Sequence, residues 1–207
     1  MAVVAVDFDG TLYQKNSVSI TIKEGRKFFT IKQWGYIFSD IIKGVVKKGS
    51  GEKIDLPILF LESFFRQMKG KSKDEVYDFF VHLVKKGDKG INKGLVLRLE
   101  EHLKKGDTLV ILSGALQPFL EVFVQQLGID ANVIGTPLFY NEQNVCTGRI
   151  GTINRGSSKV NRLINWMNEN NTSDEEVWAY ADSESDIPIL EFADKAIVVN
   201  PSDKLRK

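Results

Sequence analysis

The sequence has little cysteine, almost no net charge and no long hydrophobic run, and each scarcity excludes a class of protein. The single cysteine, Cys146, cannot form an internal disulfide, so a disulfide-stapled secreted fold is excluded. The 28 basic and 27 acidic residues leave a formal net charge of +1, whereas a globally basic nucleic-acid-binding protein is expected to carry a larger excess. We therefore expect no nucleic-acid partner.

The apolar runs are too short for a membrane span, which needs about 18 consecutive apolar residues. The apolar stretch after Met1 meets Asp7 too soon to form a secretion signal. With 207 residues, 43% hydrophobic and 27% charged, the chain has the composition of one or two globular domains. We expect a soluble, cytoplasmic protein whose oligomeric state the sequence leaves open.

Short apolar runs without polar alternation predict the buried strands of a parallel sheet. Apolar residues at helical spacing lie between these runs, and strand–helix–strand alternation is typical of a doubly wound α/β domain. Ligands of such sheets bind at the carboxyl ends of the strands. The expected strands are Ala2–Val6, Thr108–Leu112, Val177–Tyr180, Ala196–Val199 and a shorter Asn132–Ile134.

Residues 15–90 break this alternation and predict a helical insertion after the first strand. Helices are expected around Lys23–Val46, Pro57–Lys69 and Lys73–Lys86, with a loop at Lys47–Lys53. The chain then divides into an α/β core of residues 1–14 and 91–207 and a helical domain of residues 15–90. The insertion has 16 basic and 9 acidic residues, a balance of +7, which either attracts an anionic substrate or reflects solvated helix faces.

An acidic pair follows the first expected strand, in the segment Asp7-Phe8-Asp9-Gly10-Thr11. Two carboxylates two residues apart point to the same side of an extended chain, and their mutual repulsion is relieved by a cation or a proton. The pair suits Mg²⁺, and it suits one carboxylate as nucleophile with the other as general acid and base. The alternative is a charged turn in which Asp9 and Thr11 cap a helix.

Three more polar clusters follow later expected elements of the core. Ser113-Gly114 can hold phosphate oxygens or form an ordinary turn, and Lys159 can neutralise phosphate or be a solvated lysine. The segment from Asp182 to Asp186 adds acidic groups, or forms a helix N-terminus capped by Ser185 or Asp186. Because four clusters coincide at one edge of one sheet, we favour a functional site.

In order and context, Asp7-Phe8-Asp9-Gly10-Thr11, Ser113, Lys159 and Asp182…Asp186 resemble the four motifs of the haloacid dehalogenase-like hydrolase superfamily. The stretches 180–188 and 198–201 resemble the subgroup related to phosphoserine phosphatase. The resemblance implies a Rossmann-like parallel sheet with an inserted all-helical cap at 15–90 and a β-hairpin at Leu138–Ile150. A response-regulator receiver domain fits less well, because its phosphorylated Asp lies on a later strand and its first strand has no helical insertion after it.

The resemblance also implies a role for each site residue. Asp7 is the nucleophile that forms an aspartyl-phosphate, and Asp9 protonates the leaving oxygen and then activates water. Mg²⁺ is held by Asp7, the backbone carbonyl of Asp9 and Asp182. The remaining residues bind phosphate or support the site: Ser113, the Gly114 amide and Lys159 surround the phosphoryl group, Asp186 orients Lys159 or a metal-bound water, and Thr11 and Ser185 are supporting residues.

We therefore expect a Mg²⁺-dependent phosphomonoesterase acting on a small phosphorylated metabolite. Phosphoserine itself is doubtful, since Asn16 and Phe64 stand where relatives carry a Glu and an Arg that read the substrate. The alternatives are a lipid-phosphate phosphatase, a phosphotransferase and a non-catalytic phosphate-binding or regulatory module. Asp9 disfavours a dehalogenase, because related dehalogenases lack this second Asp.

Aromatic and aliphatic residues are dense between positions 28 and 46, in a stretch that also carries lysines. They form the core of the helical insertion, an apolar substrate pocket or a surface that contacts lipid. We favour the core, because aromatic residues at helical spacing usually pack inside.

Overall fold

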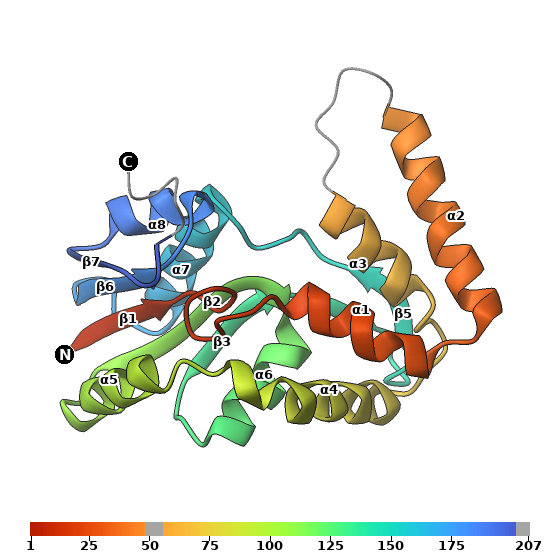
Figure 1. The fold of residues 1–207 in the computed structure, drawn as a ribbon. Helices are drawn as coiled ribbons and strands as arrows, with labels where there is room; N and C mark the ends of the chain where they lie inside the picture. Colours follow the sequence, from red (N-terminus) through yellow and green to blue (C-terminus); the bar gives the residue numbers. More distant parts are fainter. Residues whose placement is uncertain (49–55, 202–207) are drawn as a thin grey trace.

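A five-stranded parallel sheet lies at the centre of the computed structural model, which describes residues 1–48 and 56–201 (Figure 1). The strand order is β3-β2-β1-β6-β7, and every neighbouring pair is parallel, which confirms the expected α/β fold. All five expected strands are present; β2 is four residues longer than expected, and the ends of the other shifted strands move by one or two residues. Their bounds are Ala2–Val6 for β1, Thr108–Leu116 for β2, Asn132–Thr136 for β3, Glu176–Ala181 for β6 and Lys195–Val198 for β7.

Helices cover both faces of the central strand β1, which explains why all five of its residues are apolar and buried. On one face, Val4 and Val6 of β1 pack in a cluster with Leu99 of α5 and Phe123 of α6. On the other face, Val3 packs in a second cluster with residues of α7 and α8. Figure 1 shows these helix pairs on opposite sides of the sheet; they span Lys93–Lys104 (α5), Gln117–Leu127 (α6), Ser157–Glu169 (α7) and Ile187–Phe192 (α8).

In the described part of the chain, four α-helices lie between β1 and α5, where the sequence predicts a helical insertion. The helical stretch expected around Lys23–Val46 is present as parts of two helices, because the chain turns extended at Phe29 and a new helix begins at Ile31. Thr30 marks this start, since its backbone N–H and hydroxyl both donate to the Gln33 side chain at 3.0 Å. The four helices are Ser17–Phe28 (α1), Ile31–Lys48 (α2), Leu56–Arg66 (α3) and Lys73–Gly87 (α4), followed by a 3-10 turn at Asp88–Gly90.

The sequence also predicts a loop after the second of these helices and a β-hairpin before α7. The expected loop begins at Lys47, which together with Lys48 still belongs to α2; residues 49–53 lie outside the described residues. The expected hairpin is present as the antiparallel strands β4 (Leu138–Tyr140) and β5 (Cys146–Ile150).

The helical insertion and the sheet share one hydrophobic cluster. Phe80 of α4 lies 6.2 Å from Phe119 of α6, centroid to centroid, and Phe119 packs edge-on against Phe8, which follows β1. Deeper in the insertion, Phe64 is fully buried among other aromatic rings. The helices nearest the sheet are therefore held by apolar packing across the boundary.

Strand β2 continues past its expected end at Leu112 and reaches Leu116. Its pairing with β3 shifts on the way: Leu112 pairs with Ile134, but Leu116 pairs with Thr136, so β2 contains two extra residues. The Thr136 hydroxyl donates to the Gly114 carbonyl at 2.8 Å and fixes this bulge. The bulge lies at the carboxyl end of the sheet, where it presents Ser113 and Gly114 to a cavity.

Candidate active site

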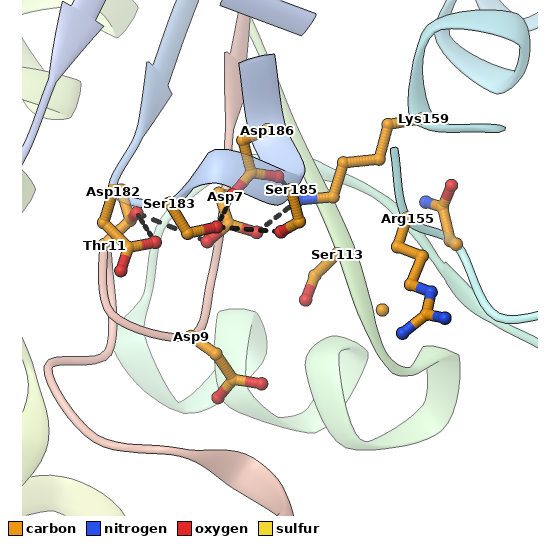
Figure 2. A network of polar contacts seen from close by, with 12 residues as sticks. Asp7, Asp9, Thr11, Ser113, Arg155, Lys159, Asp182, Ser183, Ser185 and Asp186 are labelled. Carbon is orange, nitrogen blue, oxygen red and sulfur yellow. Dashed lines mark hydrogen bonds and ion pairs between the residues drawn. The ribbon is translucent and has the colours of Figure 1, made fainter. Parts of the chain in front are cut away.

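The carboxyl ends of three adjacent strands bring the acidic motifs together. Asp7 follows β1, Ser113 lies in the bulge of β2, and Asp182 follows β6. The Asp7 backbone N–H donates to the Tyr180 carbonyl at 2.8 Å, so the pairing of β1 with β6 extends to the first acid. Figure 2 shows the resulting cluster, with Asp9 on the loop apart from it.

Lys159 enters this cluster from the first turn of α7 and is 3% exposed. Its ammonium group lies 2.5 Å from Asp7 Oδ1 and 2.5 Å from Asp186 Oδ1. Burial alone lowers the pKa of Lys159, but the charges of the two carboxylates outweigh it and hold the pKa above the usual lysine value. Lys159 is therefore a charged, buried group, and the alternative of a solvated lysine is wrong.

Three carboxylates converge beside this lysine. One oxygen each from Asp7, Asp182 and Asp186 lie within 4.8 Å of one another. Burial raises the pKa of Asp182 to about 6, and the charges of Asp7 and Asp186 add to this. Burial also raises the pKa of Asp7, which the Lys159 charge opposes. Oxygen donors at this density are what a hard cation such as Mg²⁺ binds, so the donor set fits the expected metal.

Hydroxyl groups complete the cluster. The Thr11 hydroxyl lies 3.3 Å from Asp7 Oδ2 and 3.3 Å from Asp182 Oδ1, while the Ser183 hydroxyl donates to Asp186 Oδ2 at 2.5 Å. Asp186 occupies the position before α8 without capping it, and Ser185 contacts the Ser183 hydroxyl at 2.8 Å. The alternative in which Asp186 caps a helix is therefore wrong.

Asp9 points away from the carboxylate cluster and binds the start of α1. Its two oxygens accept from the Ser17 backbone N–H and the Ser17 hydroxyl, both at 2.6 Å. Burial raises the pKa of Asp9 to about 7, despite the opposing effect of these hydrogen bonds. Asp9 thus does contact a helix N-terminus, as one alternative expected, but its pKa also suits a group that gives and takes protons near neutral pH.

A cavity of about 330 Å³ adjoins these residues and is lined by Asp7, Asp9, Ser113, Gly114 and Lys159. The Ser113 hydroxyl accepts from the Ala115 N–H at 3.1 Å, whereas α6 begins after Leu116 without a side-chain cap. Ser113 is therefore no helix cap.

The two positions that bear on phosphoserine differ in their surroundings. Asn16 lines the cavity, but its side-chain oxygen accepts from the Val18 and Ser19 N–H groups and caps α1. Phe64 is absent from the described residues that line the cavity and lies in the aromatic cluster of the insertion. Neither side chain offers a charge to a substrate.

Sequence reasoning missed Ser17, Ser183 and Arg155 as site residues. Ser17 binds Asp9, Ser183 binds Asp186, and Arg155 lines the cavity with Ser113. Arg155 lies four residues before Lys159, and this short separation is the feature of the sequence that could have indicated its place in the site. Nothing in the spacing of Asp9 and Ser17 indicates that the intervening loop folds back.

Gly10 offers a test of how tightly the cluster is built. Its φ of +90° is unfavourable for other residues, and an added Cβ would overlap the Asp182 carboxylate. We expect Gly10→Ala to lower the free energy of unfolding by about 2–4 kcal/mol, from backbone strain plus the displacement of Asp182. Denaturant unfolding measures this change.

Gly70→Ala is the matched control, because Gly70 also has a φ of +90° but has open space where its Cβ would be. It measures the backbone cost alone. Equal losses in the two variants would mean that Asp182 moves aside freely and that the cluster is not tightly packed.

Comparisons with known proteins agree with this fold. The family model described as haloacid dehalogenase-like hydrolase matches residues 4–191, and the chain belongs to this family. The chain is 28% identical over 113 residues to a histidinol-phosphatase from Neisseria meningitidis serogroup C (strain 8013); these residues are 53% of this chain and 50% of that protein. The chain thus spans about half the length of this curated relative.

Solved structures share the fold over nearly the whole chain. A protein of unknown function from Bordetella pertussis Tohama I has a TM-score of 0.78 and 21% identity, covering 99% of this chain and 92% of that one. A probable phosphoserine phosphatase from Vibrio cholerae has a TM-score of 0.66 and 15% identity, covering 99% of this chain and 58% of that one. At these identities the likeness concerns the fold alone.

Proposed function

We propose that the protein hydrolyses small phosphate monoesters in a Mg²⁺-dependent reaction, with Asp7 as the nucleophile. The observation that carries the proposal is the cluster of Asp7, Asp182 and Asp186, two of which contact the buried Lys159, beside a cavity that Asp9 also lines. Charged groups of both signs are costly to bury, so a site that gathers them has a chemical use as its simplest explanation.

The carboxylates suit a magnesium ion that, when bound, supplies positive charge to the phosphate oxygens. Asp7, Asp182 and the backbone carbonyl of Asp9 are the proposed ligands. Asp186 is the third carboxylate of the cluster, but its two oxygens accept from Lys159 and Ser183. We therefore assign Asp186 to the positioning of Lys159.

Two proton and phosphoryl transfers follow from these positions. A carboxylate oxygen of Asp7 attacks phosphorus, the bond to the ester oxygen breaks, and Asp9 gives its proton to that leaving oxygen. Asp9 then takes a proton from water, whose oxygen attacks phosphorus, releases phosphate and regenerates the Asp7 carboxylate. Lys159, Ser113 and the Gly114 amide stabilise the negative charge on the transferring group.

The cavity argues against phosphoserine as the substrate. Its wall includes Arg155, but also the apolar side chains of Val18, Leu61, Phe80 and Phe119, which offer no partner for the charged groups of an amino acid. A phosphate ester with an apolar organic part fits this wall better. The name of the histidinol-phosphatase relative points to a small phosphorylated metabolite, and a lipid phosphate stays the alternative.

Phosphate release from an aryl phosphate tests the proposal. We expect release with Mg²⁺, a loss of at least about tenfold with a chelator, and recovery when Mg²⁺ is restored. Borohydride reduction during turnover should convert residue 7 to homoserine, which mass spectrometry detects. Increased turnover with an added alcohol, together with a phosphorylated alcohol as product, would instead indicate a phosphotransferase.

Absence of both release and trapping, across a panel of aryl, sugar, amino-acid and lipid phosphates, would contradict the proposal. The protein would then be a phosphate-binding module on a hydrolase scaffold.

A further inference from the structure

One face of α2 is apolar and exposed. Ile31 is 92% exposed, Phe38 59%, Ile42 62% and Val46 75%. These four residues, which we call the outer stripe, are spaced by seven, four and four positions and so lie on one side of the helix. The opposite side packs inward, where Ile37 is fully buried and Gly44 lies against Leu59 of α3.

The apolar density between residues 28 and 46 therefore serves two purposes. Phe29, Trp34, Ile37 and Ile41 belong to or pack against the core, as expected, but the outer stripe does not. A groove of about 610 Å³ extends the stripe toward α1 and is lined by Ile22, Arg26, Phe29, Ile31, Trp34 and Phe38. Figure 1 shows α2 at the outer edge of the molecule.

The side chains beside the outer stripe are mainly basic, which favours a negatively charged partner. Lys32 and Lys43 are exposed on its flank, and Arg26 lines the groove. Asp40 of α2 is neutralised by Arg66 at 2.8 Å. Together with the +7 balance of residues 15–90, these side chains surround an apolar stripe with positive charge.

We propose that the outer stripe of α2 docks on an anionic lipid bilayer, with the helix lying in the plane of the interface. An apolar helix face bordered by lysines is what such interfacial helices share, and nearby lysines add attraction to anionic headgroups. No described helix is long and apolar enough to cross a membrane, which leaves surface docking. A second copy of the chain fits less well, because a two-fold contact through the stripe would bring like-charged lysines together. The inference is independent of the proposed hydrolysis.

Co-sedimentation with vesicles tests this docking. We compare vesicles of phosphatidylcholine alone with vesicles that also contain phosphatidylglycerol, and expect binding to the second, which weakens as salt rises. Phe38→Ser/Ile42→Ser should lower the vesicle affinity by at least about tenfold. Lys32→Glu/Lys43→Glu should lower it by a similar factor.

Matched controls lie on α5. Leu97→Ser removes a leucine as exposed as Ile42, and Lys93→Glu/Lys104→Glu makes the same charge change away from the stripe; neither should alter binding. Aryl phosphate hydrolysis and circular dichroism show whether each variant remains folded, and failure of the enzymatic assay alone leaves the vesicle result intact.

Three results would overturn the proposal. They are no binding to anionic vesicles, equal binding by the stripe variants, and a dimer in light scattering that Phe38→Ser/Ile42→Ser dissociates. The last result would assign the stripe to a second copy of the chain.

Discussion

Asp7→Asn is expected to lower phosphate release by at least about 10³-fold while the fold persists, because an amide cannot replace a carboxylate as nucleophile. The side chain keeps its shape at the end of β1, and Lys159 keeps its contact with Asp186. The loss should therefore appear in kcat, with a circular dichroism spectrum like that of the parent. Steady-state kinetics with an aryl phosphate measures it.

Asp107→Asn is the matched control for this prediction. Asp107 lies just before β2, at the opposite end of the sheet, where it binds the Ala2 N–H at 2.9 Å and His102 Nδ1 at 2.8 Å. Its replacement disturbs a buried network without touching the cavity, so kcat should change little. If Asp7→Asn were as active as the parent, the assignment of the nucleophile would be wrong.

Lys159→Met is expected to have the largest effect on stability. It leaves Asp7 and Asp186 buried and facing each other without the cation that both contact at 2.5 Å. Removing one partner from a buried ion pair costs about 3–5 kcal/mol, and we expect the free energy of unfolding to fall by this amount. Denaturant unfolding in the presence of chelator gives the value, and phosphate release should fall with it.

Two further variants separate charge from packing. Lys159→Met/Asp186→Asn removes one of the two unpaired carboxylates and should recover part of the lost stability. Lys93→Met, on an exposed lysine, should change stability by no more than about 0.5 kcal/mol. If the double variant were less stable than Lys159→Met, the unpaired charge of Asp186 would not be the cause of the loss.

The sequence predicts the sheet well because its central strand, β1, is apolar on both faces. Val3 and Val4 point to different clusters, so the run Ala2–Val6 has no polar position and cannot be mistaken for an exposed strand. The placement of the acidic motifs follows from the same fact, since parallel strands end at one edge.

Other features depend on contacts that a sequence pattern does not contain. The helix break at Phe29 has neither glycine nor proline; it comes from the Thr30–Gln33 contact and from the packing of Phe29 against Phe64. The extension of β2 depends on its pairing with β3. The expectation that the apolar residues between positions 28 and 46 form a core is wrong for Phe38, Ile42 and Val46. Helical periodicity identifies an apolar arc but does not say how much of that arc a neighbour covers.

The pairing of β1 determines when the carboxylate cluster can form as the protein folds. Val3 pairs with Thr108 on one side and with Val177 on the other, and Lys159 is separated from Asp7 by 152 positions. Such non-local contacts slow folding, because long loops must close before the contacts form. Asp7 is therefore translated well before Lys159, Asp182 and Asp186, and it has no charged partner from the cluster until those segments have been made. Assembly of the carboxylate cluster is in this sense a late event of folding, because it needs segments on both sides of β1 to pair first.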